Sequence, residues 1–176
     1  MSTSKEFVEL NRNVHDRDSF DCGKAELNTF LHTKAAKHMA AGISRTLLLP
    51  GLTALPNGKF PICSFYTIAP CSIQRETLPS QLAKKLPHYP IPVFLLAQLA
   101  VHTEYQSQRL GEVTLTKALE NLRQVNAHMR AYAVIVDCLN EEAESFYRKY
   151  DFDYLCDHND RRRLFLSMKK VSVLFE

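Results

Sequence analysis

The sequence of 176 residues is poor in the residues that mark special classes of chain. It has no tryptophan and only 5 glycines and 8 prolines, so collagen-like, disordered and low-complexity chains are excluded. Hydrophobic residues make up 45% of the chain and charged residues 23%, a balance that supports a substantial core. We therefore expect one compact domain that spans residues 1–176.

The sequence also lacks the signs of export and of membrane insertion. Its start, Met1 to Glu6, does not have the charged-then-apolar order of a secretory signal. Its most apolar stretch, Ile91 to Val101, contains Gln98 and is far shorter than the ~20 residues of a membrane-spanning helix. We expect a cytoplasmic protein with no membrane partner.

The five cysteines indicate neither a disulfide framework nor a metal site. Their number is odd and no two of them have Cys-x-x-Cys spacing. We expect reduced thiols and no bound metal. The net charge of +3 permits an anionic partner without requiring one, so the distribution of charge matters more than its sum.

The pattern of apolar residues predicts alternating helices and strands, and hence an α/β (α+β) fold. The run 93–101 is apolar on both faces, which is typical of a central strand covered by helices on either side. A proline-rich loop is expected at 70–92, with a short helix at 80–86. The other expected elements are a helix at 25–40, two strands of a hairpin at 46–49 and 62–68, a helix at 115–125, a strand at 132–136, a helix after Asn140 and a closing strand at 163–175.

The central strand runs directly into a polar segment, 106–111, that opens the next helix. A loop at a helix N-terminus presents unpaired backbone N–H groups and the positive end of the helix dipole, which together suit a pyrophosphate. The same junction also fits a plain connection between a strand and a helix. The pattern alone leaves both readings open.

Three segments resemble a known family. The stretch "LAVHTEYQSQRLGE" resembles the acetyl-coenzyme A motif of the GNAT superfamily of N-acetyltransferases, Val-x-Pro-x-x-(Gln/Arg)-x-x-Gly-x-(Gly/Ala), with Val101, Gln106 and Gly111 in register. "NEEAESFYRKYDF" is similar to the downstream Asn, Phe-Tyr and Gly-Phe pattern. "FDCGKAELNTFL", followed by "GISRTLLL", narrows the resemblance to the TacT-like GNAT toxins of bacterial toxin–antitoxin pairs. The similarity spans nearly the whole chain.

This resemblance implies a GNAT fold, in which a mixed central β-sheet is flanked by helices on both faces. It also implies transfer of an acetyl group from acetyl-CoA to the α-amino group of aminoacyl-tRNA, which blocks translation. The implied partners are the aminoacyl-tRNA substrate, a ribbon-helix-helix antitoxin and a second copy of the chain in a homodimer.

The resemblance further implies a set of cofactor-binding residues. The backbone at Leu99 and Val101 would hydrogen-bond the thioester and the pantetheine arm, while N–H groups from Ser107 to Glu112 would surround the pyrophosphate. Core packing of Leu99 and Val101 is compatible with this role, and Asn140 also fits a simple helix cap. The full set is Leu99, Ala100, Val101, Gln106, Ser107, Gln108, Arg109, Leu110, Gly111, Glu112, Asn140 and Phe146.

Tyr147 is the expected catalytic residue, because the family places this hydroxyl where it can protonate the departing thiolate. The alternative is an aromatic residue on the buried face of a helix. No strong general base is conspicuous, and an α-amine acceptor would not need one. An α-amine of pKa ~7.7–8.0 is about one-tenth neutral at pH 7, whereas a lysine amine of pKa ~10.4 is neutral about once in 2,500. His102 and Glu104 offer a proton relay through water, or are simply residues of a surface turn.

Basic residues suggest a surface for the tRNA backbone, whose binding would then weaken steeply with salt. A solvated face is the alternative for each of them. The candidates are Lys34, Lys37, Arg45, Lys84, Lys85, Arg161, Arg162 and Arg163.

The chain departs from the family pattern at three positions. Arg109 replaces the first glycine of the loop, His102 replaces an aspartate, and Asp151 replaces the glycine before Phe152. A glycine allows positive φ and a close approach to phosphate, whereas Arg109 adds a Cβ and a cation that either pairs with the pyrophosphate or crowds it. Two other functions stay open: an ordinary acetyltransferase acting on a small amine or a protein amine, and a catalytically impaired binding module.

Overall fold

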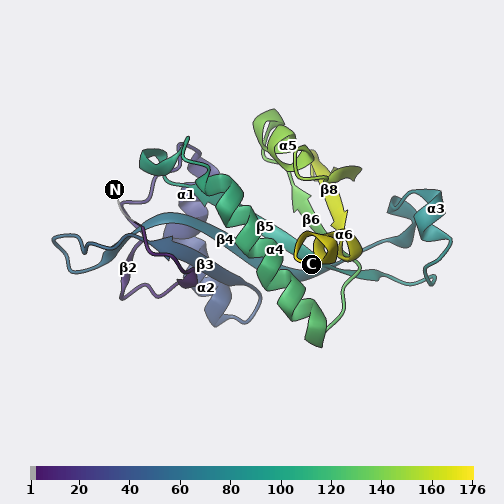
Figure 1. The fold of residues 1–176 in the computed structure, drawn as a ribbon, viewed down its shortest axis with the longest axis horizontal. Helices are drawn as coiled ribbons and strands as arrows, with labels where there is room; N and C mark the ends of the chain where they lie inside the picture. The colour runs from purple at the N-terminus through teal and green to yellow at the C-terminus, as the bar shows by residue number, and fades with distance from the viewer. Residues whose placement is uncertain (1–2) are drawn as a thin grey trace. The chain divides into compact units, whose positions relative to one another are not determined.

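The computed structural model describes residues 3–176, and these form two compact units (Figure 1). The first contains the described residues up to Ala69 together with Ala97–Ala118, and the second contains Pro70–Leu96 and Leu119–Glu176. The chain passes from one unit to the other within two strands and one helix. The expectation of a single domain remains a prediction.

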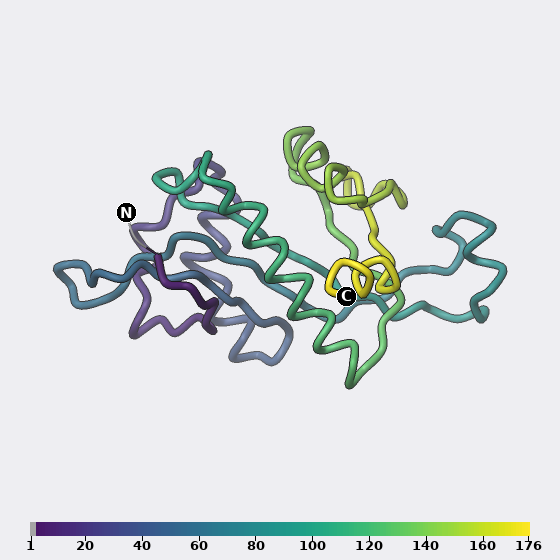
Figure 2. The backbone as a smooth tube through the Cα atoms, in the orientation of Figure 1, coloured from purple at the N-terminus to yellow at the C-terminus, as the bar shows by residue number. Residues whose placement is uncertain are grey.

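The first unit is built on antiparallel strands. Strand β3 (Arg45–Pro50) pairs with β1 (Val8–Glu9) on one side and with β4 (Phe60–Ile73) on the other. Strand β2 (His15–Asp16) pairs with β4 in parallel. The expected hairpin is confirmed, and its connection, residues 51–59, extends beyond the strands in Figure 2.

One interrupted helix packs on these strands, as the spacing of apolar residues predicts. It consists of α1 (Ala25–Thr29), a wider π-helical turn η1 (Phe30–Lys34) and α2 (Ala35–Ala40). Leu31 and Ala35 are fully buried, and they belong to a core cluster that includes Phe20 and Phe65. The prediction of a helix at 25–40 is therefore confirmed.

The second unit carries a mixed part of the sheet. The start of β5 (Ile91–Val101) pairs in parallel with β6 (Ala133–Asp137). Strand β6 pairs antiparallel with β8 (Arg161–Ser167), which pairs antiparallel with β7 (Asp153–His158). The remaining elements of this unit are η2 (Arg75–Thr77), α3 (Ser80–Ala83), α5 (Glu141–Arg148), α6 (Met168–Leu174) and the second half of α4 (Leu110–His128).

Two expectations about secondary structure need correction, and some strands were not predicted. Strand β4 continues to Ile73, so the proline-rich loop begins later than residue 70. Residues 163–175 are not one strand, because the side chain of Ser167 accepts a hydrogen bond from the Lys170 N–H and starts helix α6. Strand β7 was not predicted, since its alternation is broken by a bulge between Tyr154 and Cys156.

No helix among residues 3–176 is both long enough and apolar enough to cross a membrane. The five cysteines are free thiols.

Candidate active site

At the C-terminal end of β5, the main-chain N–H and C=O groups of successive residues point alternately towards β4 and away from it. The N–H of His102 donates to the carbonyl of Cys63 in β4 at 2.8 Å. Because successive residues of a strand point their N–H and C=O groups to opposite sides, those of Leu99 and Val101 point away from β4. This is the orientation that the expected backbone contacts with a pantetheine arm require.

The segment after this strand has a backbone conformation that is rare for residues other than glycine. Ser107 has φ +65° and Arg109 has φ +59°. Both lie in the left-handed region, where a Cβ is unfavourable by ~1–2 kcal/mol. Arg109 therefore holds a conformation that a glycine would adopt at lower cost, although it carries a long side chain.

Helix α4 begins directly after this loop, and its first turn leaves N–H groups free for an anion. The first helical bond runs from the Val113 N–H to the Arg109 carbonyl at 3.1 Å. The N–H groups of Leu110, Gly111 and Glu112 precede it and have no acceptor within the helix. Helix dipole and free N–H groups together make this junction fit a diphosphate.

The side chain of Gln106 hydrogen-bonds two main-chain carbonyl groups near the start of the loop. Its amide Nε2 donates to the carbonyl of Cys22 at 3.0 Å and to that of Val101 at 2.9 Å. The side-chain amide therefore ties the start of the loop to the end of β5 and to an N-terminal turn. The carbonyl of Val101 is engaged by this bond, which leaves its N–H for any contact with a cofactor.

His102 does not have the free nitrogen that a proton relay needs. Its Nδ1 accepts from the Glu104 N–H at 3.1 Å, and its Nε2 lies 3.2 Å from the carbonyl of Ser19. Because Nδ1 accepts, the Nε2 N–H is the group that faces the Ser19 carbonyl. His102 stabilises the turn η3 (Thr103–Tyr105) that leads into the loop.

In the second unit, Asn140 caps helix α5. Its Oδ1 accepts a hydrogen bond from the Ala143 N–H at 2.9 Å, and its backbone is extended, as in a standard N-cap. Glu141 and Glu142 occupy the first turn, where the helix dipole favours negative charge. The cap is thus present, and Asn140 is an exposed residue.

Tyr147 lies on the buried face of α5 with 8% of its surface exposed. Its ring packs edge-on against Phe146 at 5.2 Å and against Phe152 at 5.3 Å between centroids. Burial, with a smaller contribution from the nearby Cys138 thiol, raises the pKa of Tyr147 well above its ordinary value. The hydroxyl therefore holds its proton at every physiological pH, as a general acid must before it acts.

A cavity of about 500 Å³ opens beside the N-terminus of α5. Arg161 and Arg162 line it from the start of β8, and Glu144 lines it from the helix. The Glu144 carboxylate accepts from Arg148 at 2.9 Å and from Arg162 at 3.2 Å. The sequence contains the signal for the first of these pairs, an i,i+4 spacing, but not for the second.

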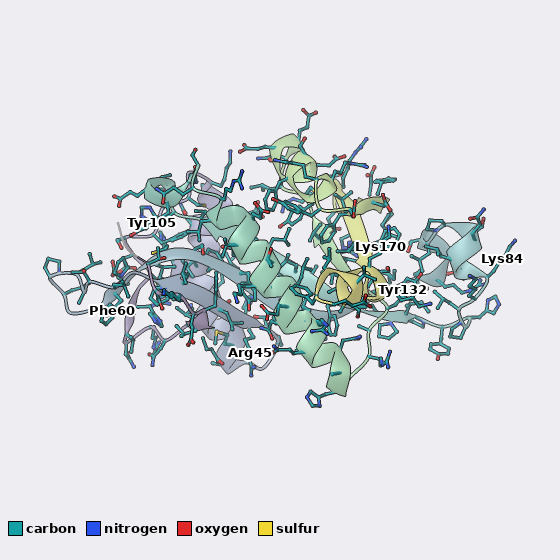
Figure 3. All side chains as sticks on the ribbon, viewed as in Figure 1. Arg45, Phe60, Lys84, Tyr105, Tyr132 and Lys170 are labelled. Carbon is teal, nitrogen blue, oxygen red and sulfur yellow. The ribbon has the colours of Figure 1, made fainter. Side chains whose placement is uncertain are left out.

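The expected basic residues occupy different environments. Arg163 is buried and bound to Asp137, so we leave it out of any surface for tRNA. Arg162 stacks over Tyr154 at 5.5 Å from the ring centroid, besides its pair with Glu144. Lys84 extends from the end of α3 into solvent in Figure 3. The other exposed candidates are Lys34, Lys37, Arg45 and Lys85.

Residues 83–152 match a family model described as the acetyltransferase (GNAT) family. The chain has a GNAT domain. The predicted fold, a mixed sheet flanked by helices, is thereby confirmed, and so is the sequence resemblance on which it was based.

Three known proteins are similar to this chain over almost its full length. The tRNA-acetylating toxin of Mycobacterium tuberculosis is 29% identical over 166 residues, which are 93% of this chain and 94% of that protein. AtaT complexed with acetyl-methionyl-tRNAfMet is 28% identical, with a TM-score of 0.85 over 97% of this chain and 99% of that one. AtaTR bound with acetyl-CoA is 25% identical, with a TM-score of 0.81 over 97% of this chain and 98% of that one.

Proposed function

We propose that this protein is an acetyl-CoA-dependent N-acetyltransferase that acetylates the α-amino group of aminoacyl-tRNA. In this proposal it is a toxin that blocks translation in the cytoplasm, forms a homodimer and is neutralised by a ribbon-helix-helix antitoxin. The observation that carries the proposal is the similarity of 93% of the chain to a tRNA-acetylating toxin. The similarity to AtaT in complex with an acetylated aminoacyl-tRNA supports the same substrate class.

The loop between β5 and α4 is the proposed binding site for the diphosphate of acetyl-CoA. Its support is local: two residues in the left-handed region and three helix N–H groups without a helical acceptor. The main-chain groups of Leu99 and Val101, turned away from β4, are proposed to hold the pantetheine arm. Acetyl-CoA supplies the acetyl group as a reactive thioester.

Tyr147 is the proposed general acid. The amine nitrogen bonds to the thioester carbon, the C–S bond breaks, and the departing sulfur takes up the Tyr147 Oη proton, which the proton lost by the amine then replaces. Its raised pKa keeps this proton in place until the reaction needs it. No side chain has to remove a proton from the substrate beforehand, since an aminoacyl α-amine of pKa ~7.7–8.0 is about one-tenth neutral at pH 7. This argument favours an α-amine over a lysine amine as acceptor.

The decisive experiment incubates the protein with charged tRNA and radiolabelled acetyl-CoA, with uncharged tRNA as the control. Label that is recovered on the aminoacyl group, and that disappears when the aminoacyl ester is hydrolysed, supports the proposal. Label found only on polyamines or proteins contradicts it in favour of an ordinary acetyltransferase. A folded protein that transfers no label contradicts it in favour of a binding module, for which Arg109 in the loop is the structural reason.

A further inference from the structure

The N-terminal segment "FDCG" forms a tight turn whose function the sequence does not explain. At its centre the Asp21 carboxylate accepts from the Gly23 N–H at 2.8 Å, and Gly23 has φ +83°. The backbone hydrogen bond from Gly23 and the one from the Asn28 side chain hold the pKa of Asp21 below its ordinary value. The turn is therefore a defined structure rather than a loose connection.

Asn28, in α1, fixes this turn with both ends of its amide group. Its Oδ1 accepts from the Cys22 N–H at 2.9 Å, and its Nδ2 donates to the Asp21 carboxylate at 2.9 Å. One side chain thus holds the backbone of Cys22 and the side chain of Asp21 at the same time. Because the Cys22 N–H is occupied in this way, the orientation of the neighbouring peptide groups is set by Asn28.

The carbonyl groups of the same turn support the segment that leads into the loop. The Asp21 carbonyl accepts from the Thr103 N–H at 2.8 Å, and the Cys22 carbonyl accepts from the Gln106 Nε2 at 3.0 Å. Gln106 is the residue directly before Ser107, where the left-handed conformation begins. A continuous path of hydrogen bonds therefore runs from Asn28 through the turn to the start of the loop.

We propose that Asn28 is a positioning residue for the diphosphate loop and acts on it through Cys22 and Gln106. This inference rests on the proposed binding of acetyl-CoA at that loop. Ser107 and Arg109 hold unfavourable backbone conformations, which persist only when the surrounding structure fixes them. The side chain of Gln106 is the link between that fixed geometry and the N-terminal turn.

The test measures binding of CoA by calorimetry and the kinetics of acetyl transfer for Asn28→Ala, Gln106→Ala and the double variant. Each single change removes hydrogen bonds of the path and raises the Kd and the KM for acetyl-CoA roughly tenfold, while kcat and the KM for the acceptor stay unchanged. The double variant binds about as weakly as the weaker single variant, because both changes interrupt one path. Asn126→Ala is the matched control, since its Oδ1 accepts from the Ala131 N–H at 2.9 Å in another turn.

The outcomes separate this inference from the proposed function. Wild-type protein that takes up no CoA overturns the proposed function. If the wild-type protein binds CoA and the Asn28→Ala variant binds it with the same Kd, only the positioning role is overturned. If the factors by which the two single changes raise the Kd multiply in the double variant, the inference is also overturned, because independent contributions to the binding free energy add. If Asn28→Ala does not fold, Gln106→Ala provides the test, since Gln106 is exposed. An unchanged KM for acetyl-CoA in Gln106→Ala overturns the proposed path.

Discussion

Arg163 and Asp137 face each other in the paired strands β8 and β6 and are joined by two parallel hydrogen bonds. The distances are 2.7 Å from Nε to Oδ1 and 2.9 Å from Nη2 to Oδ2. The Arg163 side chain is 8% exposed and that of Asp137 is 25% exposed. The pair therefore neutralises a charge that the folded protein keeps out of water.

Replacing Asp137 by alanine should lower the free energy of unfolding, because it leaves a buried guanidinium without its counter-charge. Breaking a buried pair in this way costs about 3 kcal/mol or more. Urea titration of the Asp137→Ala variant measures the free energy of unfolding. Glu9→Ala is the control: its pair with Arg45 is 3.6 Å long and exposed, so its removal changes stability by about 0.5 kcal/mol or less. Equal effects of the two substitutions would contradict a structural role for Arg163.

Replacing Tyr147 by phenylalanine removes the proposed acid and keeps the packing of its ring against Phe146 and Phe152. We expect kcat to fall by about 10²- to 10⁴-fold, with little change in the KM for acetyl-CoA. Steady-state kinetics with labelled acetyl-CoA measure both constants. Tyr150→Phe serves as control, because it removes a hydroxyl from the same aromatic group, where Tyr150 packs on Phe146 at 5.2 Å. A wild-type kcat in Tyr147→Phe would exclude the hydroxyl from the reaction.

Arg109 should strengthen binding of CoA through its charge, because its side chain is exposed beside the loop that we assign to the diphosphate. Replacing it by alanine keeps the Cβ and removes the guanidinium together with the methylene groups that carry it. We expect the Kd for CoA to rise by about fivefold at low salt, and the difference to shrink at high ionic strength as the charges are screened. Calorimetry at two salt concentrations checks this. Tighter binding by Arg109→Ala would show instead that the side chain crowds the diphosphate.

Asp151 stands at the end of α5 with φ +68°, in the left-handed region. The Phe152 N–H returns to the carbonyl of Tyr147 and the Asp151 N–H to that of Arg148, as in a helix end that favours glycine. Asp151→Gly should therefore raise the free energy of unfolding by about 1 kcal/mol. Asp151→Ala keeps a Cβ and should give no gain. Thermal unfolding of both variants measures the difference, and a gain in the alanine variant would locate the effect in the charge and not in the backbone.

The sequence predicted the elements whose signal is local. The helix at 25–40 follows from the spacing of Leu27, Phe30, Leu31 and Ala35. The replacement of family glycines by Arg109 and Asp151 was visible in the sequence, but their left-handed conformations were not predicted. Strand β7 and helix α6 were missed, because a bulge breaks the alternation of the first and a serine cap begins the second inside an apolar run.

Contacts between distant segments were beyond sequence reasoning. Arg163 belongs to a run of three arginines, and nothing local distinguishes the one that binds Asp137 from Arg161 and Arg162. The bond from Gln106 to Cys22 joins residues 84 positions apart. For the same reason, the role of a site residue could be inferred only where a motif carries it, as for Tyr147, and there it remains a prediction.

Cys138 makes the stability of the protein sensitive to alkaline pH. Burial, and then the nearby carboxylates of Glu144 and Asp137, raise the pKa of this thiol from 9.0 to about 11. Folding therefore favours the protonated thiol, and this stabilisation is complete below pH 9 and is lost as the pH rises towards 11. The loss amounts to about 2–3 kcal/mol for a shift of this size.

The Cys138→Ala variant should therefore lose less stability than the wild type between pH 9 and 11. Denaturant titrations at pH 8, 9, 10 and 11 measure the free energies of unfolding of both proteins. Ser145→Ala is the control, because Ser145 lines the same cavity and has no group that titrates in this range. Parallel curves for wild type and Cys138→Ala would mean that the thiol titrates alike in the folded and unfolded chains. A difference that narrows with rising pH shows instead that the folded protein holds the proton on Cys138.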